Sequence, residues 1–281
     1  MRIDSHQHFW RLNSEEYSWI NPGWPIYRDF LPADVAPLMK EAGMEFSIAV
    51  QARQTVEETK WLLELADRQP FIAGVVGWVD LKSDEVEEQL TNLAKHSKFV
   101  GVRHIAQDEP DDNFLLRAEF LSGVRKLKQF NLAYNILVFP RQLSATIELA
   151  RKLPEQPFVL DHMGKPAIGT GKIFPWSEQM IELAKSPNVY CKISGMVTEA
   201  NWTSWNSSDL LPYLDLVFEA FGPDRLMFGS DWPVCLLAAS YRRWFEIVED
   251  YFAQFGSETR QKIFGTNAAR FYGIAQKKPN H

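Results

Sequence analysis

The sequence predicts a (β/α)8 barrel that forms a single domain over residues 1–281. Short apolar, β-branched runs alternate with helical patterns about eight times along the chain, which is typical of parallel strands linked by helices. A length of 281 residues is close to the roughly 250 residues of one such barrel. No GxGxxG or P-loop pattern marks a nucleotide-binding open sheet, so a closed barrel is favoured.

The strands are predicted where the sequence is apolar with few interruptions. Residues 71–79, FIAGVVGWV, are such a run, and it suits a strand that is covered on both faces. Residues 83–96 instead place apolar side chains at helical spacing. Thr55 followed by Glu58 predicts a capping box at the start of another helix. The eight predicted strands are 2–8, 46–52, 71–79, 99–105, 132–138, 157–162, 189–194 and 225–230.

Two long loops are predicted to rise over the mouth of the barrel. Residues 164–175 are rich in glycine and proline, and residues 9–30 carry several aromatic rings beyond Phe9, among them Trp10, Tyr17, Trp19, Trp24 and Tyr27. Both loops follow predicted strand ends, where barrel active sites are built. The last residues, Gln276–His281, are expected to be frayed.

Composition excludes several classes of partner. The formal net charge is −6 and the charges are interspersed, so no basic stripe is present for nucleic acid. No uncharged apolar run approaches the ~20 residues of a membrane span, and the charged N-terminus does not resemble a signal peptide. We therefore expect a cytoplasmic monomer or small homo-oligomer with a small-molecule substrate. Cys191 and Cys235 are expected to be reduced, buried thiols.

The first chemical signal is the segment DSHQH on the opening strand. Alternation predicts that Asp4, His6 and His8 point to one face and that Ser5 and Gln7 point to the other. Two histidines on the inner face near the carboxyl end of a barrel strand suit a metal or oxyanion site. The alternative is a packed pair of histidines satisfied by hydrogen bonds.

Two further signals follow later strands. His162 and Lys165 place an imidazole and a cation beside the mouth, although Asp161 and His162 could instead form a structural pair. Asp231 ends a strongly apolar run, so partial desolvation is expected to raise its pKa and to suit it for general-base catalysis. The alternative for Asp231 is a cap on the next helix.

Weaker signals are GVRH (101–104), KISG (192–195) and one tryptophan. Arg103 is a stronger candidate than His104, because a buried arginine needs an acidic or ligand partner. Trp78 closes the third predicted strand and could stack on a substrate, although core packing is the commoner role for such a ring. Ser194 lacks the GxSxG elbow, so a serine nucleophile is not expected.

Taken together, these motifs resemble the amidohydrolase superfamily, in the branch that contains sugar lactonases and 2-pyrone-4,6-dicarboxylate lactonase. They lie in barrel order over nearly the whole chain. Three further stretches, QAR (51–53), LVFPRQ (137–142) and DWPVCL (231–236), are similar to members of that branch that hydrolyse L-fuconolactone. The motifs that carry the resemblance are DSHQHFW (4–10), GVRH, LDHMGKP (160–166), KISG and FGSDWP (228–233).

The resemblance implies hydrolysis of a small sugar lactone, L-fuconolactone or a related 1,5- or 1,4-lactone, to the open-chain acid. Asp231 would activate water, while His6, His8 and His162 would polarise the carbonyl. The residues expected to bind the substrate are Arg103, Lys165, Trp78 and His104.

Metal-dependent superfamily members add a histidine on strand five and often a lysine on strand four. Here residues 133–138 contain no histidine, and strand four supplies Arg103 and His104 instead. His6, His8 and Asp231 could hold one divalent ion such as zinc, with His162 as a fourth partner. We expect that no cofactor is strictly required.

Three alternatives remain open. One is a zinc-dependent amidohydrolase or decarboxylase on the same barrel. Another is a lactonase for a carboxylate-bearing substrate such as the pyrone dicarboxylate, which would use Arg53, Arg103 and Arg141. The third is a catalytically inactive barrel that binds a sugar acid.

Overall fold

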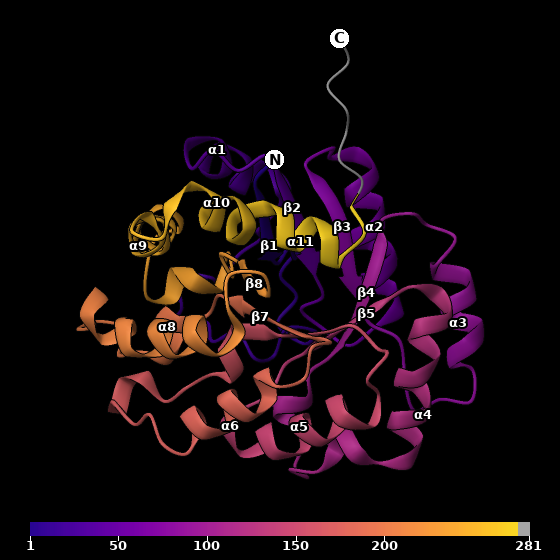
Figure 1. The fold of residues 1–281 in the computed structure, drawn as a ribbon. Helices are drawn as coiled ribbons and strands as arrows, with labels where there is room; N and C mark the ends of the chain where they lie inside the picture. Colours follow the sequence, from indigo (N-terminus) through magenta and orange to yellow (C-terminus); the bar gives the residue numbers. More distant parts are fainter. Residues whose placement is uncertain (275–281) are drawn as a thin grey trace.

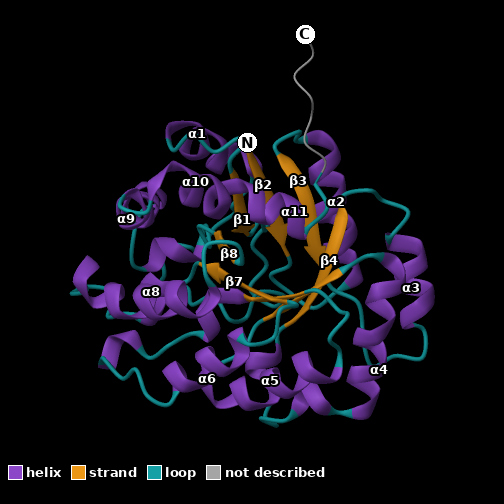
Figure 2. Ribbon diagram, in the orientation of Figure 1, coloured by secondary structure: helices purple, strands orange, loops and turns teal. Residues whose placement is uncertain are grey.

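Eight parallel strands form the centre of the computed structural model, which describes residues 1–274. The strands pair in chain order from β1 to β8 (Figure 1), and helices surround them (Figure 2). The predicted (β/α)8 barrel is therefore confirmed. The predicted frayed tail, Gln276–His281, lies outside the described residues. The strands are β1 (Ile3–Gln7), β2 (Phe46–Val50), β3 (Ile72–Gly77), β4 (Phe99–His104), β5 (Ala133–Ile136), β6 (Phe158–Leu160), β7 (Val189–Ile193) and β8 (Leu226–Phe228).

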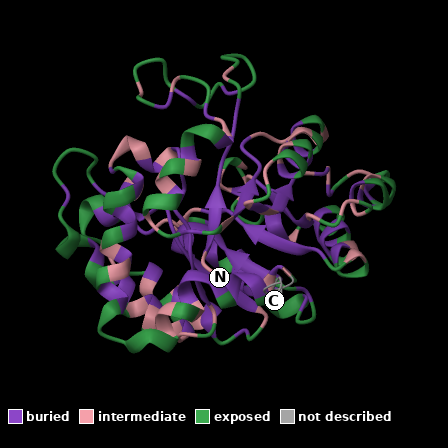
Figure 3. Cartoon of the chain, turned by 90° about the horizontal axis from the view of Figure 1, so that it is seen from above, coloured by how far each residue is buried: buried purple, intermediate pink, exposed green. Residues whose placement is uncertain are grey.

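The helices turn buried faces toward the strands and exposed faces outward, as Figure 3 shows. The helix predicted over 83–96 is shorter, because α3 begins at Val86 and ends at Leu93. Within residues 1–274, none of the helices combines the length and the apolar character that a membrane crossing requires. The α-helices are α1 (Pro32–Glu41), α2 (Val56–Arg68), α3 (Val86–Leu93), α4 (Ala118–Leu127), α5 (Leu143–Lys152), α6 (Trp176–Ala184), α7 (Met196–Glu199), α8 (Ser207–Phe221), α9 (Tyr241–Ala253), α10 (Gly256–Gln261) and α11 (Asn267–Phe271).

The ring of strands is completed by hydrogen bonds between β1 and the segment just after β8. The Asp231 amide donates to the His6 carbonyl at 2.9 Å, and the His8 amide donates to the Trp232 carbonyl at 2.7 Å. These bonds hold His6 of β1, His8 just after it and Asp231 in one register. Two candidate motifs separated by more than two hundred positions are thus joined through their backbones.

The predicted orientation of Asp4 is wrong. Its pairing with β2 is irregular between Asp4 and Gln7, so the simple alternation of faces breaks there. Asp4 Oδ2 accepts hydrogen bonds from Gln7 Nε2 at 2.8 Å and from the hydroxyl of Tyr241 on α9 at 3.0 Å. Asp4 Oδ1 also accepts from the Ser230 amide at 2.8 Å. Asp4 therefore ties β1 to α9 and to the turn before Asp231 rather than facing the two histidines.

The amino-terminal end of the barrel interior is filled by apolar side chains and by α11. Ala268 and Ala269 of α11 pack with barrel residues such as Ile48 and Val159. Just after α11, the Tyr272 hydroxyl accepts a hydrogen bond from Asn135 Nδ2 at 3.0 Å. This end is closed, so the polar candidates lie together at the carboxyl ends of the strands.

Candidate active site

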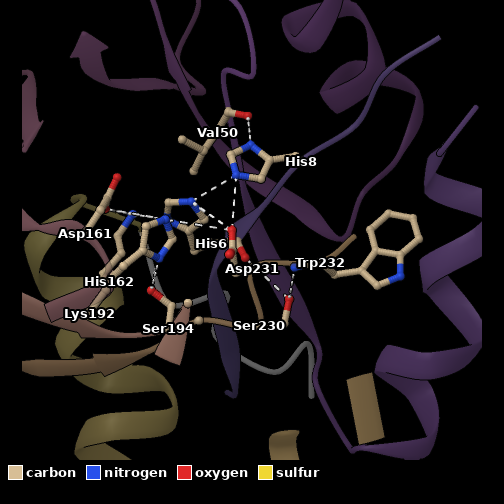
Figure 4. Close-up of polar contacts among 12 residues, drawn as sticks. His6, His8, Val50, Asp161, His162, Lys192, Ser194, Ser230, Asp231 and Trp232 are labelled. Atoms are coloured by element: carbon tan, nitrogen blue, oxygen red, sulfur yellow. Dashed lines mark hydrogen bonds and ion pairs between the residues drawn. The ribbon is translucent and has the colours of Figure 1, made fainter. Parts of the chain in front are cut away.

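Three imidazoles surround the carboxylate of Asp231 at the carboxyl end of the barrel (Figure 4). Asp231 Oδ1 lies 3.3 Å from His8 Nε2, 3.7 Å from His6 Nε2 and 3.8 Å from His162 Nε2. All four residues are buried, with at most 4% of their surface exposed. The structure therefore brings together the four residues that the sequence singled out as catalytic.

Left-handed backbone turns aim two of these side chains. His162 and Met163, just after β6, have φ of 53° and 54°, and Asp231, just after β8, has φ of 57°. Such conformations cost non-glycine residues on the order of 1–2 kcal/mol each. The turn after β6 is held by Trp176, whose indole Nε1 donates to the Met163 carbonyl at 2.8 Å. Strain of this kind persists at sites where the surrounding structure fixes a side chain in one direction.

His8 presents a lone pair to the cavity. Its Nδ1 lies 2.9 Å from the carbonyl of Val50, and a carbonyl can only accept. The hydrogen of a neutral His8 is therefore on Nδ1, and Nε2 is an acceptor. This geometry suits a metal ligand or a proton acceptor, and it differs from the carbonyl-donor role that the sequence predicts for His8.

His162 is positioned by a serine that the sequence analysis set aside as a nucleophile. Ser194 Oγ lies 2.9 Å from His162 Nδ1 and is fully buried. The hydroxyl can donate or accept, so it supports either tautomer of the ring. The role of Ser194 is therefore to orient His162.

A buried charge network lies beneath His6. Lys192 of β7 places Nζ 3.0 Å from Asp161 Oδ1 and 3.1 Å from His6 Nδ1. Arg103 of β4 places Nη1 3.2 Å from Asp161 Oδ2, and its other nitrogens donate to Gln51. Two cations thus share one buried carboxylate. The predicted acidic partner of Arg103 is Asp161.

These charges set the protonation of the network. Burial would raise the pKa of Asp161, but Lys192 and Arg103 hold that pKa below its ordinary value of 3.8. Burial lowers the pKa of Lys192 to about 8, with the ion pair to Asp161 opposing the shift. Burial and neighbouring cations lower the pKa of His6 well below 6.5. At neutral pH, Lys192 is therefore mainly an ammonium and His6 is a neutral ring.

The predicted rise in the pKa of Asp231 is wrong. Burial of the carboxyl acts in the predicted direction, but His162, His8 and Lys165 together hold the pKa of Asp231 below 3.8. The pKa of His162 is itself lowered well below 6.5, chiefly by burial. Asp231 is thus ionised at neutral pH and can accept a proton.

A cavity of about 290 Å³ opens over this centre. Its polar lining includes Asp231, His8, His162, Arg103, Lys165 and Glu199, and three indole rings, Trp19, Trp24 and Trp202, also line it. A larger groove of about 750 Å³ lies between α2 and α3, but none of the predicted catalytic residues lines it. The smaller cavity is the candidate site because buried polar groups converge on it.

Glu199 is a cavity residue that sequence reasoning missed. It lies at the end of α7, and Lys165 Nζ is 3.6 Å from its Oε1. Burial raises the pKa of Glu199, while Lys165 opposes that shift. Its position four residues beyond the KISG motif was the signal that could have identified it.

Two of the four predicted substrate-binding residues do not line the cavity. His104 Nε2 pairs with Glu109 at 2.7 Å, and its ring stacks on Phe114. Trp78 directs Nε1 toward His104 Nδ1 at 3.4 Å. These two residues therefore lie in the packing behind the barrel wall, whereas Arg103 and Lys165 reach the cavity.

The aromatic loop over residues 9–30 is fastened to the start of α2. The Tyr17 hydroxyl donates to Glu58 Oε1 at 3.1 Å, and Arg53 pairs with Glu16. The predicted capping box is only half formed: Thr55 accepts from the Glu58 amide, but the Glu58 carboxylate turns to the amides of Ala52 and Arg53. Glu58 therefore anchors the loop that carries two of the cavity indoles.

Glu58→Gln is expected to change how stability depends on pH. Burial raises the pKa of Glu58 from 4.5 to about 7, so between those values the folded protein holds a proton that the unfolded chain has released. The contribution of Glu58 to the free energy of unfolding should therefore fall as pH rises from 5 to 7, by roughly 2 kcal/mol. The glutamine variant should lack this fall. Urea unfolding at several pH values measures it.

The matched control for this prediction is Glu64→Gln, at an exposed position on the same helix. It removes the same formal charge and should preserve the wild-type slope. If the free energy of unfolding depends on pH in the same way in wild type and Glu58→Gln, the assignment of the proton to Glu58 is wrong.

The spacing of three ligand atoms fits a divalent metal ion. Nε2 of His6, Nε2 of His8 and Oδ1 of Asp231 are 3.1 to 3.7 Å apart. Ligands at ~2.0–2.1 Å from a tetrahedral zinc are separated by about 3.4 Å. His8 also presents the lone pair that a metal needs. The distances therefore accommodate one ion, with His162 near enough to be a fourth partner.

The fold and this centre define a class of protein: a (β/α)8 barrel with an imidazole–carboxylate site at the carboxyl ends of strands 1, 6 and 8. The chain belongs to the amidohydrolase family, whose model matches residues 3–274. The resemblance that the sequence motifs indicated is thus confirmed.

Curated relatives and solved structures cover nearly the whole chain. The chain is 41% identical to an L-fucono-1,5-lactonase of Burkholderia ambifaria, over 97% of this chain and 96% of the relative. It is 42% identical to an L-fucono-1,5-lactonase of Burkholderia multivorans, over 98% and 97%. A crystal structure of an amidohydrolase from Burkholderia multivorans with bound zinc has 43% identity and a TM-score of 0.93, covering 98% of this chain and all of that chain.

Proposed function

We propose that this protein hydrolyses L-fucono-1,5-lactone or a closely related sugar lactone to the open-chain sugar acid. The observation that carries the proposal is the convergence of three imidazoles on Asp231 beneath a cavity of sugar size. The chain is also 41–42% identical to two L-fucono-1,5-lactonases over nearly its whole length. The enzyme is thus a hydrolase that acts on a cyclic ester.

The reaction begins when water attacks the lactone carbonyl carbon. Asp231 accepts a proton from that water, because its lowered pKa keeps the carboxylate ionised at neutral pH. His8 lies beside this base, with Nε2 3.3 Å from Asp231 Oδ1, and both residues line the cavity. The attacking water is therefore expected between the Asp231 carboxylate and the lactone carbonyl.

Negative charge then develops on the carbonyl oxygen. His162 lines the cavity and can donate an N–H from Nε2 to this oxygen, and a well-placed donor of this kind is worth about 3 kcal/mol in the transition state. The carbon–oxygen bond of the ring breaks, and the proton held by Asp231 passes to the departing ring oxygen. An ester leaving group needs less protonation than an amine, so a site of this kind is sufficient for a lactone.

A zinc ion held by His6, His8 and Asp231 would supply Lewis-acid polarisation of the same carbonyl. Lys165 and Glu199 form an ion pair on the cavity wall, so together they can donate to and accept from sugar hydroxyls. The indoles of Trp24 and Trp202 have ring centroids 5.3 Å apart. They offer apolar faces to the C–H side of a sugar ring.

The arginines favour a sugar lactone over a dicarboxylate. A substrate with two carboxylates calls for guanidinium groups that face the cavity. Arg53 instead pairs with Glu16 and Arg141 with Asp112, while Arg103 is held by Gln51 and Asp161. The candidate arginines are thus engaged within the protein.

The test is a pH-indicator assay of purified protein on four substrates: L-fuconolactone, D-arabinonolactone, L-galactonolactone and L-rhamnonolactone. We expect the fastest hydrolysis with L-fucono-1,5-lactone, and activity should survive exhaustive chelation. Heat-denatured protein gives the spontaneous rate. Rates equal to that control would support the inactive sugar-acid binder, and loss on chelation restored by zinc would favour the zinc-dependent alternative.

A further inference from the structure

We propose that Lys192 is a positioning residue that fixes the hydrogen of His6 on Nε2. His6 is then a hydrogen-bond donor on the side that faces His8 and Asp231, and it is a poor metal ligand in that state. The consequence for catalysis rests on the proposed lactonase function. The position of the hydrogen does not, because it follows from the contacts of the ring alone.

The contact on one side of the ring is with a group that can only donate. Lys192 Nζ lies 3.1 Å from His6 Nδ1, and both side chains are fully buried. The ammonium is held in place by Asp161 Oδ1 at 3.0 Å. An ammonium has three hydrogens and no lone pair, so the contact requires an unprotonated Nδ1. A neutral His6 must then carry its hydrogen on Nε2.

The other side of the ring is consistent with that tautomer. His6 Nε2 lies 3.1 Å from His8 Nε2, which is an acceptor because the His8 hydrogen is directed from Nδ1 to the Val50 carbonyl. Arg103 Nη1 is also 3.4 Å from His6 Nε2, but it has a shorter contact of 3.2 Å with Asp161. A hydrogen on His6 Nε2 satisfies the His8 contact.

This arrangement is the reverse of the usual second shell of a metal site. A histidine that ligates a metal normally donates its other N–H to a carboxylate or carbonyl. Here the nearest group to His6 Nδ1 is the donor Lys192, and the carboxylate of Asp161 is farther away, at 3.5 Å. For Nε2 to ligate zinc, the hydrogen must move to Nδ1, and Lys192 must then leave this contact or give up a proton so that Nζ can accept. Lys192 therefore favours the donor state over metal binding.

Nuclear magnetic resonance of the metal-free wild-type protein tests this directly. Long-range ¹H–¹⁵N spectra of histidine-labelled protein distinguish the two neutral tautomers, and we expect His6 to be protonated on Nε2. A His6 ring protonated on Nδ1 would overturn the proposal. This measurement needs no variant and no turnover, so its outcome is separate from that of the lactone assay.

Zinc affinity supplies the second test. Lys192→Met removes the donor and keeps a side chain of similar length, so Asp161 becomes the nearest partner for a hydrogen on His6 Nδ1. We expect zinc to bind about tenfold more tightly, measured by competition with a chromophoric chelator. Lys165→Met is the matched control, because it removes one positive charge from the cavity without touching His6 Nδ1. Equal effects of the two variants would attribute the change to charge alone and contradict the proposal.

Discussion

Asp231→Asn is expected to lower kcat for lactone hydrolysis by about a thousandfold, which is within the range that general-base catalysis contributes. The amide nitrogen cannot accept a proton from water, while the side chain keeps its size. Oδ1 of Asp231 is surrounded by three imidazoles at 3.3 to 3.8 Å, and none of these neighbours is a carboxylate that could replace it as the base. Steady-state kinetics on L-fucono-1,5-lactone measure the loss.

The interpretation of this variant depends on an intact fold. The backbone bond from the Asp231 amide to the His6 carbonyl does not involve the carboxylate, so the thermal unfolding midpoint should be nearly unchanged. Near-normal turnover in a folded Asp231→Asn protein would remove Asp231 as the base. The same kcat loss accompanied by a large fall in the unfolding midpoint would instead point to a structural role.

The fold could be predicted because local patterns and global architecture agree in this chain. Apolar runs identified all eight strands, since a strand covered on both faces has few polar positions. Their ends could not be placed as well. Residues 157–162 were predicted as one strand, but β6 ends at Leu160, and the next residues turn into a left-handed conformation. A turn that is held by a distant contact, here from Trp176, leaves no local signal.

The four catalytic candidates were predicted for a related reason. Side chains at the carboxyl ends of barrel strands must meet at one rim, whatever their distance in sequence. The chemistry of each group could not be predicted in this way. The pKa of Asp231 is lowered by His8, His162 and Lys165, and those partners come from separate strands whose side-chain directions only the structure gives.

The position of Asp4 shows the same limit within a single strand. Alternation placed it beside His6, but an irregular register with β2 turned it toward Tyr241. The Lys192–Asp161 pair is a further case, since a lysine on β7 and an aspartate after β6 carry no mark of their pairing in sequence. Contacts between buried charged groups therefore follow from the three-dimensional fold and are not indicated by the sequence.

The second large effect is expected from Gly195→Ala, which should lower kcat about a hundredfold. A Cβ at Gly195 would lie 2.5 Å from His162 Nδ1 and 2.6 Å from its Cγ. The ring must move, and the 2.9 Å contact with Ser194 must break. A displacement of about 1 Å in a catalytic group can cost 10²-fold in rate. Steady-state kinetics together with the unfolding midpoint measure both consequences.

Backbone strain is separated from ring displacement by Gly171→Ala. Gly195 has φ 64° and ψ 5°, and Gly171 has φ 66° and ψ 10°, so alanine costs about 1 kcal/mol of left-handed strain at either position. A Cβ at Gly171, however, meets no atom within 4 Å. Both variants should therefore lose stability through backbone strain, but only Gly195→Ala should lose turnover. If the two variants keep the same kcat, the orientation of His162 does not limit the reaction.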